Sequence, residues 1–209
     1  MEIRRTDALK ASPRMFESDV LDRLSRVHPA VPVVIFVPAI AWLVVSDGGR
    51  ASTLETVGLL LGGYAFWTLT EYWMHRLVFH FEPERGWGAR LHWIIHGVHH
   101  DHPNDPLRLV MPPSVSVPLA LLFCGLFVLV LGAGPAPLFA AGFLAGYLAY
   151  DMTHFWLHHR RPRSRLGKLL RELHMRHHFQ DDTRGFGVSA PFWDYVFGTS
   201  VPRTPRRES

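Results

Sequence analysis

Residues 137–158 read PLFAAGFLAGYLAYDMTHFWLH, and this stretch decides how the rest of the chain is interpreted. Its first part, 137–149, contains no charged residue, which indicates a buried or membrane-spanning helix. His154 and His158 follow directly, four residues apart. Because positions i and i+4 lie on the same face of a helix, both imidazoles should point the same way. The stretch predicts an apolar helix that ends in a pair of histidines.

Three further apolar runs cover residues 29–45, 54–70 and 115–131. SDGGRAS (46–52) joins the run 29–45 to the run 54–70, and GAGPA (132–136) joins 115–131 to 137–149. Both connectors are short and rich in turn residues. A soluble four-helix bundle would show amphipathic stripes rather than long, nearly uncharged windows. The pattern therefore predicts an all-α integral membrane protein with four transmembrane helices arranged as two hairpins.

The distribution of charge predicts the topology. Arginine and lysine are concentrated in the N-terminal segment, between Arg76 and Arg108, and after Arg160, whereas Arg50 is the one basic residue in a hairpin turn. By the positive-inside rule, both termini and the middle segment are expected to be cytoplasmic. We expect a polar N-terminal tail (1–28), a membrane domain (29–200) and a disordered basic tail (201–209). A bias toward Arg, Ala, Gly and Pro suggests a bacterial inner membrane.

Composition excludes some classes of function. The net charge of +4 comes from arginines that flank the apolar runs, so it does not indicate nucleic-acid binding. The chain has a single cysteine, Cys124, in an apolar run. It can form neither an internal disulfide nor a cysteine-based metal site.

The histidines form a repeated pattern. Ten of the 14 fall into four groups spaced H-x4-H, H-x2-H-H, H-x3-H and H-x2-H-H, all within the polar segments 71–114 and 150–200. They are His75, His80, His96, His99, His100, His154, His158, His174, His177 and His178. Each half of the chain supplies a pair at the end of an apolar run, and an H-x-x-H-H group follows the pair. Members of three groups share a helix face at spacings i, i+3 and i+4.

One pair does not fit regular helix geometry. His75 and His80 are five residues apart, so their side chains would lie roughly 140° apart around an ideal α-helix. For both to face the same site, the helix must end or be distorted near His80. Pro83, just downstream, is compatible with a helix end there.

These groups indicate a metal centre in a helical cap on the cytoplasmic side. Imidazole suits zinc, iron, copper and nickel, and ten ligands are too many for one ion but suit two. Glu71, Asp151 and His92 are candidates to orient a ligand through its second ring nitrogen. Ordinary structural roles are expected for His28, His102 and His159. Asp181, Asp182 and Asp194 are expected to be solvated or to cap helices.

In these groups the chain resembles the integral-membrane fatty acid hydroxylase superfamily, and most closely its fatty acid (ceramide) 2-hydroxylases. The stretches HGVHHDHPNDPLRLVMPP, YDMTHFWLHH and HMRHHFQDDTRGFGVSAPFWDYVFGT carry the resemblance, which covers roughly residues 60–200. It implies four spans capped by a cytoplasmic domain with a diiron centre, a site that zinc can occupy in purified protein. It also implies that all ten grouped histidines are metal ligands, with no catalytic residue apart from them.

The reaction implied by the resemblance is hydroxylation of a long acyl chain at carbon 2, in lipid and sphingolipid metabolism, with O2 and two external electrons. Eukaryotic 2-hydroxylases carry an N-terminal haem domain that delivers these electrons. Here only ~30 residues precede the first apolar run, too few for a domain with its own core, so a separate electron-donor protein is expected. Two alternatives stay open: a sterol or carotenoid hydroxylase or desaturase of the same superfamily, and a membrane metal transporter.

Overall fold

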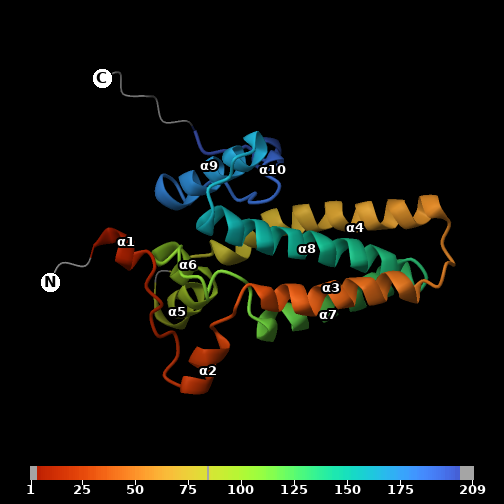
Figure 1. Ribbon diagram of the computed structural model, residues 1–209, viewed down its shortest axis with the longest axis horizontal. Coiled ribbons are helices and arrows are strands. Elements are labelled where there is room, and N and C mark those ends of the chain that lie inside the picture. The colour runs from red at the N-terminus through yellow and green to blue at the C-terminus, as the bar shows by residue number, and fades with distance from the viewer. Residues whose placement is uncertain (1–3, 84, 203–209) are drawn as a thin grey trace.

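The protein is built from helices (Figure 1), and its structure, a computed structural model, describes residues 4–83 and 85–202. The long helices are α3 (Ala30–Ser46), α4 (Thr53–Met74), α7 (Pro113–Leu131), α8 (Ala136–His159) and α9 (Arg165–Phe179). The short elements are α1 (Arg5–Ala8), α2 (Asp19–Leu24), α5 (Gly86–His92), α6 (Val98–Asp101), α10 (Phe192–Val196) and two π-helical turns, η1 (His75–Phe79) and η2 (Trp93–Gly97).

The two predicted hairpins are present. The first, α3–α4, turns at Gly48 and Gly49, which both have positive φ, and α4 then starts with a capping box between Ser52 and Glu55. The second, α7–α8, turns at Gly132, which also has positive φ. Figure 1 shows both turns at one end of the bundle and the short helices with α9 at the other. The polar segments therefore lie together, as the charge pattern predicts.

Helix α8 is the centre of the bundle, and α4 packs against it most extensively. Small residues allow this close packing. A Cβ atom at Gly63 would overlap the backbone carbonyl of Phe139, and one at Gly142 would overlap that of Leu60. The two backbones can approach so closely only because both positions are glycine. This contact fixes the relative position of the two helices that lead into the histidine groups.

We expect Gly142→Ala to destabilise the fold by about 3 kcal/mol, because the added methyl group meets rigid backbone. Gly125→Ala on α7 is the matched control, since no heavy atom lies within 4 Å of a Cβ there. The control should change stability by at most about 1 kcal/mol. Thermal unfolding of the two variants in detergent measures the difference. Equal midpoints would contradict the close α4–α8 contact.

The outer surface of the bundle is apolar. The side chains of Val34, Trp42 and Val45 on α3, and of Leu121 and Leu129 on α7, are each more than half exposed. Among the described residues, α7 is the one helix that is both long and apolar enough to cross a bilayer by length and composition, while α3 is apolar but shorter. Helices α4 and α8 carry polar residues in their last turns, which lowers their hydropathy.

The N-terminal segment, predicted as a polar tail (1–28), makes specific contacts with the rest of the fold. Asp22 accepts a hydrogen bond from the Met15 amide (2.7 Å) and forms ion pairs with Arg26 (3.1 Å) and Arg108 (2.8 Å). The Met15 side chain is buried. These contacts attach the segment to the loop that precedes α7, and they hold the pKa of Asp22 down at about 2, chiefly through the Met15 hydrogen bond.

At the other end of the chain, specific contacts extend past residue 200. Val201 is buried against Gly185, and the Pro202 carbonyl accepts a hydrogen bond from Gln180 (3.0 Å). The folded part therefore includes both residues, because they close the loop that follows α9. The rest of the predicted tail, 203–209, lies outside the described residues.

Candidate metal centre

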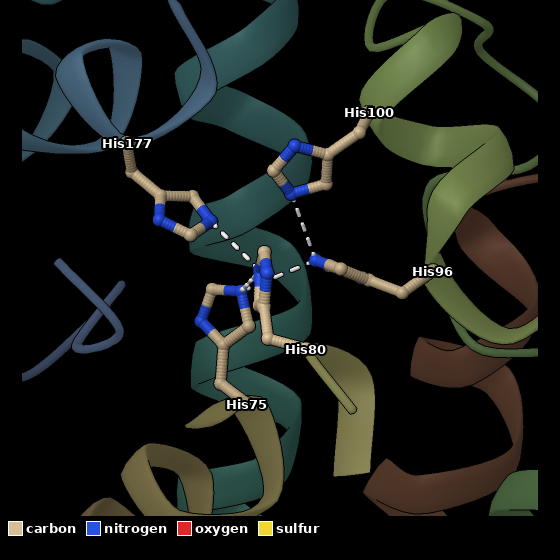
Figure 2. A group of neighbouring side chains, drawn as sticks. All are labelled: His75, His80, His96, His100 and His177. Atoms are coloured by element: carbon tan, nitrogen blue, oxygen red, sulfur yellow. Dashed lines mark hydrogen bonds between the residues drawn. The ribbon is translucent and has the colours of Figure 1, made fainter. Parts of the chain in front are cut away.

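The ten grouped histidines come together at the end of the bundle away from the hairpin turns. They form two clusters, and the ring nitrogens offered within each lie within 4.8 Å of one another. Cluster 1 contains His75, His80, His96, His100 and His177 (Figure 2), and cluster 2 contains His99, His154, His158, His174 and His178. His92, the undecided candidate, belongs to neither cluster.

Each H-x-x-H-H group is divided between the clusters. In the first group, His96 and His100 belong to cluster 1 and His99 to cluster 2. In the second, His174 and His178 belong to cluster 2 and His177 to cluster 1. Residues at i and i+4 stack on one line along a helix, whereas the residue at i+3 lies to one side. Each H-x-x-H-H group therefore lies between cluster 1 and cluster 2 and contributes histidines to both.

The His75–His80 spacing is resolved by a π-helical turn. The His80 amide donates to the His75 carbonyl (3.1 Å), the i to i+5 hydrogen bond of a π-helix. The wider turn places His80 over His75, and their Nε2 atoms are 3.2 Å apart. The predicted distortion is thus confirmed, although it lies one turn earlier than Pro83 suggests. The second π-helical turn, η2, has no comparable sequence signal.

The spacing of ring nitrogens in cluster 1 fits a bound cation. Nε2–Nε2 distances are 3.2 Å for His75–His96, 3.1 Å for His80–His177 and 3.1 Å for His96–His100. Imidazole nitrogens bind a metal such as zinc at about 2.1 Å, so two ligands at right angles stand about 3.0 Å apart. Five nitrogens at these separations can surround one ion.

The hydrogen bonds of cluster 1 also fit a bound cation. Nδ1 of His75 lies 2.7 Å from the Phe186 carbonyl, and Nδ1 of His177 lies 2.6 Å from the Arg184 carbonyl. A carbonyl only accepts, so both Nδ1 atoms carry the proton, and both Nε2 atoms of the neutral rings present lone pairs. These two lone pairs converge on Nε2 of His80, which can donate at most one hydrogen. A metal ion would satisfy all of them.

Cluster 2 has the same character. Nε2 of His99 lies 3.0 Å from that of His178, and Nε2 of His158 lies 2.8 Å from that of His174. Within the described part of the chain, the buried Nε2 of His154 has no hydrogen-bond partner. A buried ring nitrogen without a partner is costly in a folded protein, and a metal ion would remove that cost.

Burial keeps these rings neutral, as metal ligands must be. Desolvation, followed by repulsion from His177, lowers the pKa of His80 to about 3 and that of His100 to about 2. Desolvation also lowers the pKa values of His75, His96, His99, His174, His177 and His178. At neutral pH both clusters therefore present lone pairs rather than positive charges.

The two candidate carboxylates do not contact the rings as expected. Glu71 is buried, and its carboxylate accepts hydrogen bonds from the amide (2.7 Å) and the hydroxyl of Ser189. Asp151 is also buried and accepts from the Met111 amide (3.3 Å) and the Tyr147 hydroxyl (3.4 Å). Each carboxylate fixes a neighbouring segment to its helix instead. In cluster 1, backbone carbonyls rather than these carboxylates accept the ring N–H hydrogen bonds, from His75 and His177.

The remaining histidines have other partners. Nε2 of His92 and Nδ1 of His80 each lie 3.7 Å from the same Glu82 oxygen, so this carboxylate stands between His92 and cluster 1. The ring nitrogens of His28, His102 and His159 face backbone groups. These three have the structural roles expected of them.

A loop after α9, residues 184–199, supports cluster 1, and sequence reasoning missed how it is held. Asp194 is buried rather than solvated, and it accepts from the Phe186 and Gly187 amides at 2.9 Å each. It also accepts from the Thr199 hydroxyl (2.8 Å). These bonds hold the carbonyl that orients His75. The closely spaced glycines at 185 and 187 are the available sequence signal of a tight loop.

The bundle contains two apolar cavities, one of which reaches the clusters. Cavity A lies between α4, α7 and α8 and is lined by Trp67, Ala120, Phe123 and Phe143, among others. Cavity B reaches the histidines, and its wall includes His96 of cluster 1 and His99 and His154 of cluster 2. Phe79, Met111 and Tyr150 line both cavities. The two cavities are therefore neighbours, and cavity B is the one that reaches both clusters.

Comparisons with known proteins agree with this geometry. Residues 60–199 match the family described as fatty acid hydroxylase. The chain is 39% identical to the dihydroceramide fatty acyl 2-hydroxylase FAH1 of Arabidopsis thaliana, over 96% of this chain and 86% of that protein. It is 35% identical to the fatty acid 2-hydroxylase of Rattus norvegicus, over 90% of this chain and 57% of that protein.

A solved structure is similar over most of the fold. It is that of full-length scs7p, in which only the hydroxylase domain is visible. The two structures superpose with a TM-score of 0.83 at 35% identity, covering 88% of this chain and 70% of that one.

Proposed function

Because this chain belongs to the fatty acid hydroxylase family, we propose that it hydroxylates carbon 2 of long acyl chains with O2 at a two-metal centre. Its relatives include proteins named for 2-hydroxylation of dihydroceramide acyl chains and of fatty acids. The substrate proposed here is a long-chain acyl lipid of sphingolipid metabolism.

Clusters 1 and 2 would each hold one metal ion, with all ten histidines as ligands. We propose iron, because two irons supply the oxidising chemistry with O2 that protein side chains lack. Zinc is compatible with the same nitrogen ligands and can occupy the site in purified protein. The chain itself contributes neutral rings, fixed ring orientation and an apolar surrounding that excludes water.

One observation carries this proposal: the apolar cavity B ends on histidines from both clusters. An acyl chain can lie in such a cavity, and a C–H bond at its end would meet the place where the clusters adjoin. Asp151, Tyr150 and His154 line the same cavity. A carboxyl or amide group could be held by the polar atoms there. The carbon next to that group would then lie closest to the metals, which favours carbon 2.

The surroundings support a membrane enzyme. We propose that α3, α4, α7 and α8 all span the bilayer, since their outer side chains are largely apolar and the clusters lie at one end of the bundle. The arginine distribution favours a cytoplasmic location for that end and for both termini. The compared relatives are eukaryotic, so a bacterial inner membrane stays a prediction from composition. The two electrons would come from an electron-donor protein.

The test is mass spectrometry of hydrolysed lipids from a host that lacks 2-hydroxy fatty acids. Cells expressing the intact chain should contain 2-hydroxy acyl chains, and cells expressing His177→Ala should contain at least about 100-fold less, since cluster 1 loses a ligand. His159→Ala is the matched control, because His159 belongs to neither cluster. A product oxidised only on a sterol or carotenoid would contradict the proposed substrate.

A further inference from the structure

A basic groove runs along α9. Its lining includes Arg161, Lys168, Arg171, Met175, Arg176 and Phe179. The residues at 168, 171, 175 and 179 are spaced by three or four, so they form one continuous face of the helix. The groove is therefore a feature of α9 and of the segment that leads into it.

The same helix carries residues of both clusters: His174, His177 and His178. At about 100° per residue, the mean direction of the groove residues is roughly 110° from that of these histidines, and Arg171 lies on the same side of the helix as His174 and His178. A helix with its side chains is about 10–12 Å thick. The groove consequently lies within about one helix width of both clusters, and α9 carries residues of all three.

The groove carries an excess of positive charge. Its lining contains one carboxylate, Glu172, whose ion pair is with Arg176. Arg161 and Lys168 are exposed, and Nε of the partly buried Arg171 has no hydrogen-bond partner among the described residues. Three cations in the groove thus have no carboxylate partner within its lining. Met175 and Phe179 add apolar contact area to the groove.

Resting on the proposed function, we propose that this groove docks an acidic one-electron carrier protein. Hydroxylation of a C–H bond consumes one O2, two electrons and two protons, and yields one hydroxyl group and one water. Each carrier gives up one electron, so two successive encounters are needed per turnover. Charge complementarity suits brief, repeated encounters, because it accelerates association without requiring tight binding. The concave shape and the short distance across α9 favour a protein over lipid headgroups.

The test measures binding directly. The probe is a plant-type [2Fe–2S] ferredoxin, an acidic one-electron carrier, and the full chain is held in phosphatidylcholine nanodiscs. We expect the double variant Arg161→Glu, Lys168→Glu to raise the Kd at least about tenfold at low salt, with a smaller difference at high salt. The control is Arg163→Glu, Arg165→Glu, which makes the same change of charge at exposed residues outside the groove. Its Kd should change less than about threefold.

Equal Kd values for the groove and control variants would overturn the proposal. So would a groove variant that binds ferredoxin normally but loses activity only when phosphatidylglycerol is added to the discs, since the groove would then contact lipid. Product formation with dithionite as the reductant distinguishes a failure of this proposal from a failure of the proposed function. A groove variant that forms product with dithionite but not with ferredoxin supports docking, whereas absence of product from the intact chain with dithionite counts against the proposed function alone.

Discussion

A chain carrying His75→Ala together with His177→Ala should retain about one metal ion, whereas His177→Ala together with His178→Ala should retain close to none. Both double variants remove two histidines, so the total loss of ligands is equal. The first removes two members of cluster 1 and leaves cluster 2 complete. The second removes one member of each cluster, although the two residues are adjacent in sequence. Loss of one ligand typically costs a metal site much of its affinity.

Metal content per chain after gel filtration, measured by inductively coupled plasma mass spectrometry, decides the outcome. The intact chain should contain about two ions per molecule, and the control His159→Ala the same. Equal metal content in the two double variants would mean that the ten histidines act as one pool. That result would contradict the division of each H-x-x-H-H group between two sites.

The second prediction concerns chain length. We expect Ala120→Trp to reduce 2-hydroxylation of long acyl chains at least about 100-fold and to leave medium-chain substrates nearly unaffected. Ala120 lines cavity A, and an indole there would fill space that the far end of a long chain needs. Four buried methylenes at about 0.8 kcal/mol each account for about 3 kcal/mol, which corresponds to roughly 200-fold in rate.

Leu122→Trp is the matched control, since Leu122 lies on the same helix with its side chain exposed on the outside of the bundle. Competition between long and medium acyl substrates in one reaction, followed by mass spectrometry of the products, measures the ratio directly. An unchanged ratio for Ala120→Trp would show that the acyl chain does not enter cavity A.

Much of the fold follows from the sequence because helices are local structures. Uncharged windows with short, turn-rich connectors were enough to predict both hairpins, and α8 does run on from an apolar segment into His154 and His158. The spacing of five between His75 and His80 was enough to predict a distortion, since no regular α-helix aligns those positions. Each of these inferences uses the geometry of residues within one or two turns.

Other features depended on tertiary structure. The sequence indicated two metal sites but not which histidine serves which, because the contact between His80 and His177 joins residues 97 positions apart. The hydrogen-bond partners of Glu71, Asp151 and Asp194 could not be read from the sequence for the same reason. A buried carboxylate takes whichever donors the neighbouring segment brings, and here these are Ser189, Met111 and the 186–187 amides.

The sequence by itself thus determined the helical hairpins, the number of histidine groups and the end of the bundle at which they gather. Periodicity encodes these features within each segment. Only the tertiary structure decided how the ten rings divide into two clusters, which carbonyls orient His75 and His177, and where an apolar cavity reaches the rings. Those features depend on how closely α4 and α8 approach and on how α9 and its following loop close over them, and no single segment encodes that packing.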